Sequence, residues 1–194
     1  MPAPRRPALL LDRDGVINVD RGFVSRLENF EWMPGIFDVA RTAARLGRAL
    51  VVVTNQTGIG RGDYTEDDYE AVTAFMRERF EREGAGLAAV YHCPFHPEAV
   101  EARYRAANHP WRKPRPGMLL AARDDLGIDL AASAMLGDKR GDLLAGHAAG
   151  VGALGLIGNA EIAPGEVPAF ERFADLSRVP QWLENLSKAA AIRP

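Results

Sequence analysis

Short apolar runs alternate along this chain with longer segments in which apolar residues recur at helical spacing. Such alternation is typical of a parallel sheet, because parallel strands must be joined by crossover segments that are usually helices. It therefore predicts an α/β fold, a Rossmann-like parallel sheet with helices on both faces. The predicted strands are the runs at residues 8–11, 49–53, 87–91, 134–136 and 151–156.

The segments between these runs carry signals for helix starts and ends. Apolar residues recur at the spacing of one helix face after Pro34. Thr65 precedes three acidic residues and is expected to cap the next helix, and Gly127 is expected to end a later one. Further helices are predicted at residues 65–82, 116–126, 142–149 and 179–190. No repeat or linker divides the chain, so we expect one domain over residues 1–194.

Composition excludes several classes of partner. The formal net charge is −2, so no overall basic field favours nucleic acid, and an anionic ligand needs a local basic patch. No apolar stretch approaches the length of a membrane span. One cysteine excludes an internal disulfide framework and suits a reducing compartment. We expect a cytoplasmic protein that binds neither nucleic acid nor membrane, and we expect it to act as a monomer.

Ligands of open parallel sheets bind beyond the carboxyl ends of the strands, and polar residues follow several strands here. Asp12 and Asp14 follow the first run, two residues apart, so in extended chain their carboxylates point to the same side. Such a pair attracts a divalent cation such as Mg²⁺. Gly15 then allows a tight turn. For an isolated motif of this kind, a turn with solvated aspartates is the alternative.

A glycine-rich segment, TNQTGIGRG, follows the second run. Its Thr54 hydroxyl and the backbone N–H groups beside its glycines suggest a phosphate cradle, and Arg61 adds a permanently charged donor. The alternative is a loop whose glycines serve only the backbone conformation.

Two later segments add charged residues at further strand ends. Arg112 and Lys113 end a long irregular loop, and Lys113 is placed to neutralise charge between carboxylates and a phosphate. Asp138, Lys139 and Asp142 follow the fourth run, where a third carboxylate for Mg²⁺ is expected and Asp142 would orient the cluster. The alternatives are a solvated basic turn for the first segment and a helix start with favourable acids for the second.

These four segments, in this order, resemble the motifs of the haloacid dehalogenase superfamily of phosphatases. DRDGVIN, VVVTNQTGIGRG, RKPRPGML and GDKRGD resemble more specifically the D-glycero-D-manno-heptose 1,7-bisphosphate 7-phosphatase family. The resemblance extends from Leu9 to about Gly155. It implies the haloacid dehalogenase fold and a phosphatase for a small-molecule sugar phosphate. Histidinol phosphate, or another small phosphate ester, is the alternative substrate, because the histidinol-phosphate phosphatase branch has similar motifs.

The resemblance also implies roles for the matched residues. Asp12 would attack phosphorus and become an aspartyl-phosphate, and Asp14 would protonate the leaving oxygen and then activate water. Thr54 and Lys113 would hold the transferring group. The implied cofactor is Mg²⁺, bound by the Asp12 carboxylate, the Asp14 carbonyl and Asp138.

Substrate contacts are implied around these residues. Arg61 and Arg112 would grip a second phosphate. No segment is long enough for a large cap domain, so the loops at 20–30, 56–64 and 93–112 would shape a fairly open pocket. The expected substrate-binding residues are Asp20, Arg21, Gly22, Phe23, Thr54, Asn55, Gln56, Arg61, Arg112, Lys113 and Lys139.

One departure concerns zinc. Relatives carry a zinc site of the form C-x-H followed by C-x-C just before R-K-P, but here Phe95 and Trp111 occupy two of the ligand positions. Neither side chain binds metal, so we expect no zinc and a loop held by aromatic residues and prolines. A rearranged site is the alternative, formed by His92, Cys93, His96 and His109.

Two other protein classes are alternatives to a phosphatase. A response-receiver domain also combines aspartates, a threonine and a lysine around magnesium, but its phosphorylated aspartate follows the third strand, where this chain has Tyr91, His92 and Cys93. A non-catalytic sugar-phosphate binder is the remaining alternative. The intact catalytic set argues against it: Asp12, Asp14, Thr54, Lys113 and Asp138.

Overall fold

Six parallel strands form a single sheet in the order β3-β2-β1-β4-β5-β6 in the computed structural model, which describes residues 5–192. The predicted parallel sheet is confirmed, and the ends of the predicted domain, at residues 1–4 and 193–194, lie outside the described residues. The strands are β1 (Ala8–Leu11), β2 (Ala49–Asn55), β3 (Leu87–Cys93), β4 (Ala134–Gly137), β5 (Ala153–Ile157) and β6 (Glu171–Phe173).

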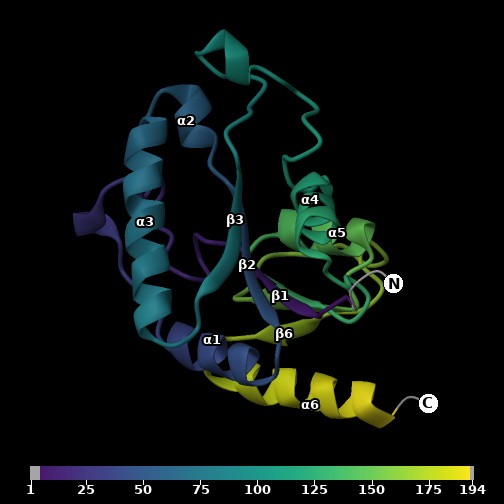
Figure 1. Ribbon diagram of the computed structural model, residues 1–194. Coiled ribbons are helices and arrows are strands. Elements are labelled where there is room, and N and C mark those ends of the chain that lie inside the picture. Colours follow the sequence, from purple (N-terminus) through teal and green to yellow (C-terminus); the bar gives the residue numbers. More distant parts are fainter. Residues whose placement is uncertain (1–4, 193–194) are drawn as a thin grey trace.

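Helices cover both faces of this sheet, as predicted (Figure 1). Along β1, Leu9 and Leu11 belong to one buried cluster and Ala8 and Leu10 to the other, because side chains of a strand alternate between its faces. The first cluster packs under α1 (Ile36–Arg45), α3 (Glu66–Arg82) and α6 (Val179–Ile192). The second packs under α4 (Gly117–Leu126) and α5 (Arg140–Ala149).

The predicted helix ends agree closely with the structure. The Thr65 side chain accepts a hydrogen bond from the Asp68 backbone N–H while Asp68 accepts one from the Thr65 N–H, so a capping box starts α3. Gly127 ends α4 with a φ of 63°, which favours glycine. Helix α5 begins at Arg140, two residues before the predicted start at residue 142.

The sixth strand, β6, was not predicted. It is three residues long, and its first two residues, Glu171 and Arg172, are charged and exposed, so the segment lacks the apolar run used to recognise buried strands. It pairs in parallel with β5 at one edge of the sheet.

The glycine-rich segment after β2 differs from the predicted phosphate cradle. It folds into the short helix α2 (Thr57–Arg61), in which Gly58 and Gly60 are buried. A Cβ on Gly58 would lie 2.2 Å from Cε1 of Tyr64, and one on Gly60 would lie 2.4 Å from the Pro94 carbonyl oxygen. Packing against neighbouring segments therefore requires these two glycines.

The irregular segment between β3 and α4 is held by aromatic packing. The Phe95 and His109 rings stack with centroids 3.6 Å apart and planes at 6°, and Tyr104 meets Phe95 edge-on. Cys93 is buried, and His92 lies 3.1 Å from a Glu66 carboxylate oxygen.

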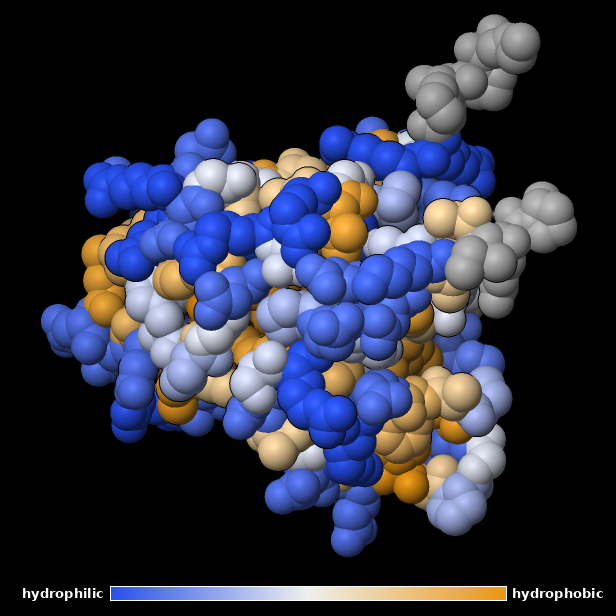
Figure 2. Space-filling view, turned by 90° about the horizontal axis from the view of Figure 1, so that it is seen from below, coloured by the Kyte–Doolittle hydropathy of each residue, from blue (hydrophilic) through white to orange (hydrophobic). Residues whose placement is uncertain are grey.

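The face of the molecule seen from below is mostly hydrophilic, with hydrophobic residues scattered among the polar ones (Figure 2). Helix α6 lies against α1, and Arg45 of α1 forms an ion pair with Glu184 of α6. Within residues 5–192, no helix is both long enough and apolar enough to cross a membrane.

The strand order reverses direction between β1 and β4. From β1 the chain proceeds outward through β2 to β3, and from β4 it proceeds the other way through β5 to β6. The carboxyl ends of β1 and β4 therefore flank the crevice in which open α/β sheets bind their ligands.

Candidate active site

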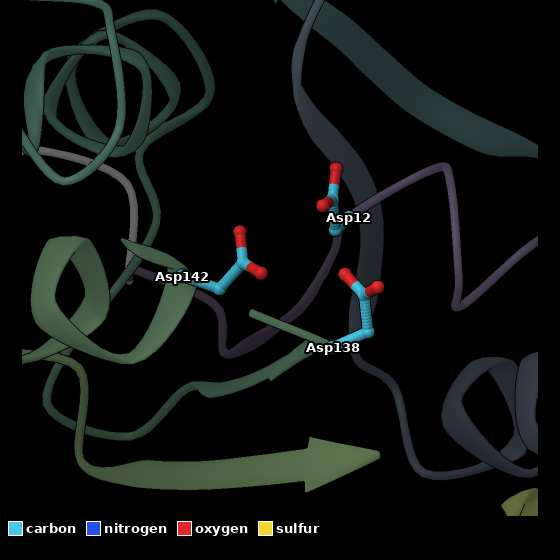
Figure 3. Close-up of side chains that lie close together, drawn as sticks. All are labelled: Asp12, Asp138 and Asp142. Carbon is cyan, nitrogen blue, oxygen red and sulfur yellow. The ribbon is translucent and has the colours of Figure 1, made fainter. Parts of the chain in front are cut away.

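Three carboxylates meet at this crevice. Asp12 follows β1, Asp138 follows β4, and Asp142 lies in the first turn of α5. One carboxylate oxygen from each residue lies within 4.8 Å of the other two, and their side chains converge in Figure 3. Three like charges this close repel one another strongly, so the cluster needs compensating positive charge.

Lys113 supplies part of that charge. Its Nζ lies 3.0 Å from Asp12 Oδ1 and 2.5 Å from Asp142 Oδ1, and it donates a hydrogen bond to the Val53 carbonyl oxygen at 2.8 Å. These three contacts match the three donors of an ammonium group. Burial alone would lower the pKa of Lys113, but the charges of Asp12 and Asp142 raise it, so the side chain stays positive.

The cation beside Asp138 is more distant, since Lys139 Nζ lies 3.8 Å from Asp138 Oδ2. Burial and the nearby Asp12 charge raise the pKa of Asp138 to about 7. Its Oδ1 is buried and receives no hydrogen bond within the described chain. Gly15, with a φ of 86°, makes room for this carboxylate, since a Cβ there would lie 2.3 Å from Asp138 Oδ2. Buried carboxylate oxygens with free lone pairs suit a hard divalent cation, so the residues fit Mg²⁺.

Asp14 lies outside the carboxylate cluster, although it lines the same cavity of about 220 Å³ as Asp12. Its carboxylate accepts hydrogen bonds from Arg13 at 2.9 Å, from Asn18 at 2.9 Å and from Gln56 at 2.9 Å. Arg13 is 1% exposed and also donates to the Val24 carbonyl oxygen. A set of N–H donors therefore fixes Asp14 at the cavity wall.

A second cavity of about 260 Å³, called the mouth of the site below, adjoins the first. Lys139 and Asn55 line both cavities, and at the mouth Lys139 Nζ forms an ion pair with Asp20 Oδ2 at 2.8 Å. Hydrogen bonding to Lys139 lowers the pKa of Asp20 despite its partial burial. Further predicted substrate-binding residues lining the mouth are Gly22, Phe23, Gln56 and Arg112.

Comparisons with known proteins bear on this arrangement. Residues 110–159 match the family described as HAD-hydrolase-like. The chain is 51% identical over 150 residues to the D-glycero-alpha-D-manno-heptose-1,7-bisphosphate 7-phosphatase of Burkholderia mallei, covering 77% of this chain and 79% of the relative. It is 43% identical over 189 residues to the D-glycero-beta-D-manno-heptose-1,7-bisphosphate 7-phosphatase of Escherichia coli K12, covering 95% and 97%. This chain belongs to the D-glycero-manno-heptose-1,7-bisphosphate 7-phosphatase family.

The fold agrees with that membership. The solved D,D-heptose 1,7-bisphosphate phosphatase of B. bronchiseptica, complexed with magnesium and phosphate, superposes with a TM-score of 0.78 at 26% identity, covering 92% of this chain and 98% of that one. This member of the heptose-bisphosphate phosphatase family is therefore a phosphoric monoester hydrolase of the haloacid dehalogenase type, and residues 5–192 form no large cap.

Two predicted substrate residues of this family member lie away from both cavities. Arg21 forms an ion pair with Glu31, and Arg61 Nη2 lies 3.6 Å from Glu98. Both arginine side chains are largely exposed, at 58% and 41%, and neither lines the site or its mouth. Arg61 is the last residue of α2 and its side chain lies beside Glu98, whereas Thr57 at the start of the same helix lines the mouth.

Asn55 takes a structural role in addition to lining the cavity. Its side chain donates to the Lys113 carbonyl oxygen at 3.1 Å and accepts from the Lys113 backbone N–H at 3.0 Å. This pair of hydrogen bonds ties the end of β2 to the segment that carries the lysine, and so fixes where Lys113 enters the site.

Among the residues of the site that the sequence analysis did not select are Arg13, Asn18 and Tyr64. Arg13 stands between two aspartates directly after a buried strand, and Asn18 closes the turn that follows, with Gly15 N–H donating to its carbonyl oxygen at 2.7 Å. The positions of Arg13 and Asn18, directly after a buried strand and in the turn that follows it, could therefore have identified both as site residues from the local sequence. Tyr64 carries no local signal, because it reaches the site only through the fold of α2.

Proposed function

We propose that this enzyme removes the 7-phosphate of D-glycero-D-manno-heptose 1,7-bisphosphate, with Mg²⁺ as cofactor and through an aspartyl-phosphate on Asp12. The observation that carries the proposal is the position of Asp12 at the sheet crevice, between the Lys113 ammonium and the Asp138 carboxylate. The substrate follows from the names of the curated relatives at 51% and 43% identity.

Asp12 is arranged as a nucleophile. Both hydrogen bonds to its carboxylate go to Oδ1, one from the Arg13 backbone N–H at 2.7 Å and one from Lys113. Within residues 5–192, no group donates to Oδ2, which leaves a carboxylate oxygen with free lone pairs facing the cavity. Oδ2 attacks phosphorus, the bond from phosphorus to the sugar oxygen breaks, and a phosphoryl-aspartate forms.

Asp14 moves the protons of both half-reactions. It lines the same cavity as Asp12, and it gives its proton to the departing sugar oxygen. In the second half-reaction it takes a proton from the water that attacks the phosphoryl-aspartate, which releases phosphate and restores Asp12. Thr54 and Lys113 stabilise the charge of the transferring group from the opposite wall.

Mg²⁺ would be held by the carboxylates of Asp12 and Asp138 and by the Asp14 backbone carbonyl. When bound, it supplies positive charge against the phosphoryl oxygens. Asp142 would be a poor ligand, because its carboxylate already accepts from Lys113 and from the Lys139 backbone N–H at 2.9 Å. We infer that Asp142 instead positions Lys113.

The mouth suits a sugar with a second phosphate. Arg112 and Lys139 bring positive charge to this cavity, in addition to Arg13, which is paired with Asp14. Hydroxyl, amide and carboxylate groups and the Phe23 ring also line it. Phe23 is 48% exposed there and offers an apolar surface to a sugar face.

Initial rates of phosphate release test this assignment. The panel contains both anomers of the heptose 1,7-bisphosphate, fructose 1,6-bisphosphate, histidinol phosphate and an aryl phosphate. We expect a preference of about 100-fold in kcat/KM for one heptose anomer, equivalent to about 2.7 kcal/mol. A comparable preference for histidinol phosphate would instead identify histidinol phosphate as the substrate of this enzyme. No release from any compound would overturn the catalytic assignment in favour of a binding protein.

Asp138→Asn tests the metal site. An asparagine has the same shape but no charge, so Mg²⁺ binding followed by calorimetry is expected to weaken by at least about tenfold, with a matching rise in the Mg²⁺ concentration needed for half-maximal activity. Asp124→Asn is the matched control, because Asp124 lies on α4 with 62% of its side chain exposed and forms an ion pair with Arg123, away from the carboxylate cluster. Equal Mg²⁺ affinity in both variants would contradict the proposed ligand.

A further inference from the structure

Tyr64 does not contact Asp14 or Thr54 by a hydrogen bond in the described residues, but it is linked to both through one intervening side chain, Gln56. We propose that it is a positioning residue that acts through Gln56 to direct the protons of Thr54 and Asp14 toward the substrate. The inference rests on the proposed phosphatase function, which it deepens by adding a residue that never touches the substrate.

The series of hydrogen bonds from Tyr64 to the site passes through the side-chain amide of Gln56. The Tyr64 hydroxyl donates to Gln56 Oε1 at 2.5 Å. On its other side, Gln56 Nε2 donates to Thr54 Oγ1 at 2.9 Å and to Asp14 Oδ2 at 2.9 Å. The reverse amide orientation would place Oε1 against the Asp14 carboxylate, where two acceptors repel. Tyr64 therefore reinforces the orientation in which the amide N–H groups face the site.

This orientation decides what Thr54 can do. Because Gln56 donates to Thr54 Oγ1, the hydroxyl already serves as an acceptor on that side. Its own proton is then free to be donated into the cavity that Thr54 lines together with Asp12. A flipped amide would offer Oε1 as an acceptor and draw the Thr54 proton away from the phosphoryl group.

The same orientation decides where a proton on Asp14 goes. All the side-chain partners of the Asp14 carboxylate are N–H donors: Arg13, Asn18 and Gln56. A protonated Asp14 finds no acceptor among them, so its O–H is left for the departing sugar oxygen. If the Gln56 amide were flipped, Oε1 would accept a hydrogen bond from the protonated Asp14. The Asp14 O–H would then point toward Gln56 instead of toward the departing sugar oxygen.

The fold holds Tyr64 closely in this place. Tyr64 is 7% exposed, and a Cβ on Gly58 would lie 2.2 Å from its ring, so α2 carries a glycine where the ring rests. The Phe23 ring lies 6.1 Å away on the mouth side. Burial raises the pKa of Tyr64 above its ordinary value, which keeps the hydroxyl protonated and able to donate.

The test compares Tyr64→Phe with Tyr69→Phe. Tyr69 is the matched control: it is 3% exposed, belongs to the same small cluster as Tyr64, and makes no hydrogen bond to Gln56 or Asp14 in the described chain. We expect Tyr64→Phe to lower kcat about tenfold with KM within about twofold, as the loss of one buried hydrogen bond predicts. Tyr69→Phe should keep the wild-type kcat.

A second readout needs no turnover. Hydrogen exchange of the Gln56 side-chain N–H groups is followed by NMR in each metal-free protein. In Tyr64→Phe the amide loses its partner at Oε1, so its N–H groups should exchange with water at least about tenfold faster than in Tyr69→Phe. Thermal unfolding of both variants identifies any loss of fold.

The outcomes separate the two proposals. An unchanged exchange rate of the Gln56 side-chain amide together with a wild-type kcat in Tyr64→Phe overturns the role of Tyr64, as does an equal fall in kcat in both variants. If the wild-type enzyme releases no phosphate from any compound of the panel, the proposed function fails, and the exchange measurement alone still decides whether Tyr64 controls the Gln56 amide.

Discussion

Asp12→Asn is expected to lower phosphate release by at least about 10⁴-fold while leaving the fold intact, because an amide cannot form the phosphoryl-aspartate. The substitution preserves shape at a site where Asp12 is 6% exposed, and it removes one charge from a crowded carboxylate cluster. Single-turnover release measures the rate, and mass spectrometry of the quenched reaction should detect the covalent phosphoryl group in the wild-type enzyme but not in Asp12→Asn.

The control for Asp12→Asn is the exposed Asp124→Asn on α4, which should match the wild-type enzyme in rate and in phosphoryl-enzyme. Release within about tenfold of the wild-type rate in Asp12→Asn would show that another group attacks phosphorus.

Lys113→Met is expected to have the second largest effect, on both stability and activity. Its ammonium is 2% exposed and lies between Asp12 and Asp142, so the substitution leaves two buried carboxylates without a counter-charge. The free energy of unfolding at pH 8 should fall by about 3–5 kcal/mol. Activity should fall by at least about 10³-fold, because the positive charge that stabilises the transferring phosphoryl group is lost.

The loss of stability in Lys113→Met should depend on pH in a definite direction. Burial already raises the pKa of Asp12, and without the lysine only the hydrogen bond from the Arg13 backbone N–H opposes that rise. A carboxyl whose folded-state pKa is raised stabilises the fold at low pH, and it loses that contribution as pH rises through its folded-state value. Urea unfolding should therefore show a smaller deficit at pH 5 than at pH 8.

A double variant separates charge from packing. Lys113→Met combined with Asp142→Asn removes one of the two stranded charges, and should recover part of the stability at pH 8 without recovering activity. Equal stability of the single and double variants would show that lost packing of the lysine stem, and not uncompensated charge, causes the deficit.

The strand ends were predictable because their signals are local. An apolar run followed at once by an acid identifies both Asp12 and Asp138, and the parallel sheet then brings their carboxylates to one crevice. Lys113 is different, because it comes from a long loop. Its charge suggested a role beside carboxylates and a phosphate, the family resemblance supported that role, and the hydrogen bonds between Asn55 and the Lys113 backbone show how the fold positions it.

Other features depend on contacts that no local pattern reports. Neighbouring residues Asp20 and Arg21 were predicted together, yet one pairs with Lys139 at the mouth and the other with Glu31 outside it. The glycines of α2 look alike in sequence whether they cradle a phosphate or admit a ring. Only the packing of Tyr64 and Pro94 against them distinguishes the two.

The short strand β6 has a consequence for solubility. Strand β5 (Ala153–Ile157) has the sequence ALGLI, and without a neighbour it would offer an apolar edge for pairing with other molecules. Strand β6 covers that edge and ends the sheet on a three-residue segment with Glu171 and Arg172 exposed. Because β6 is short and carries exposed charged residues, it disfavours edge-to-edge pairing with other molecules. Strand β6 therefore protects the enzyme against aggregation at high concentration.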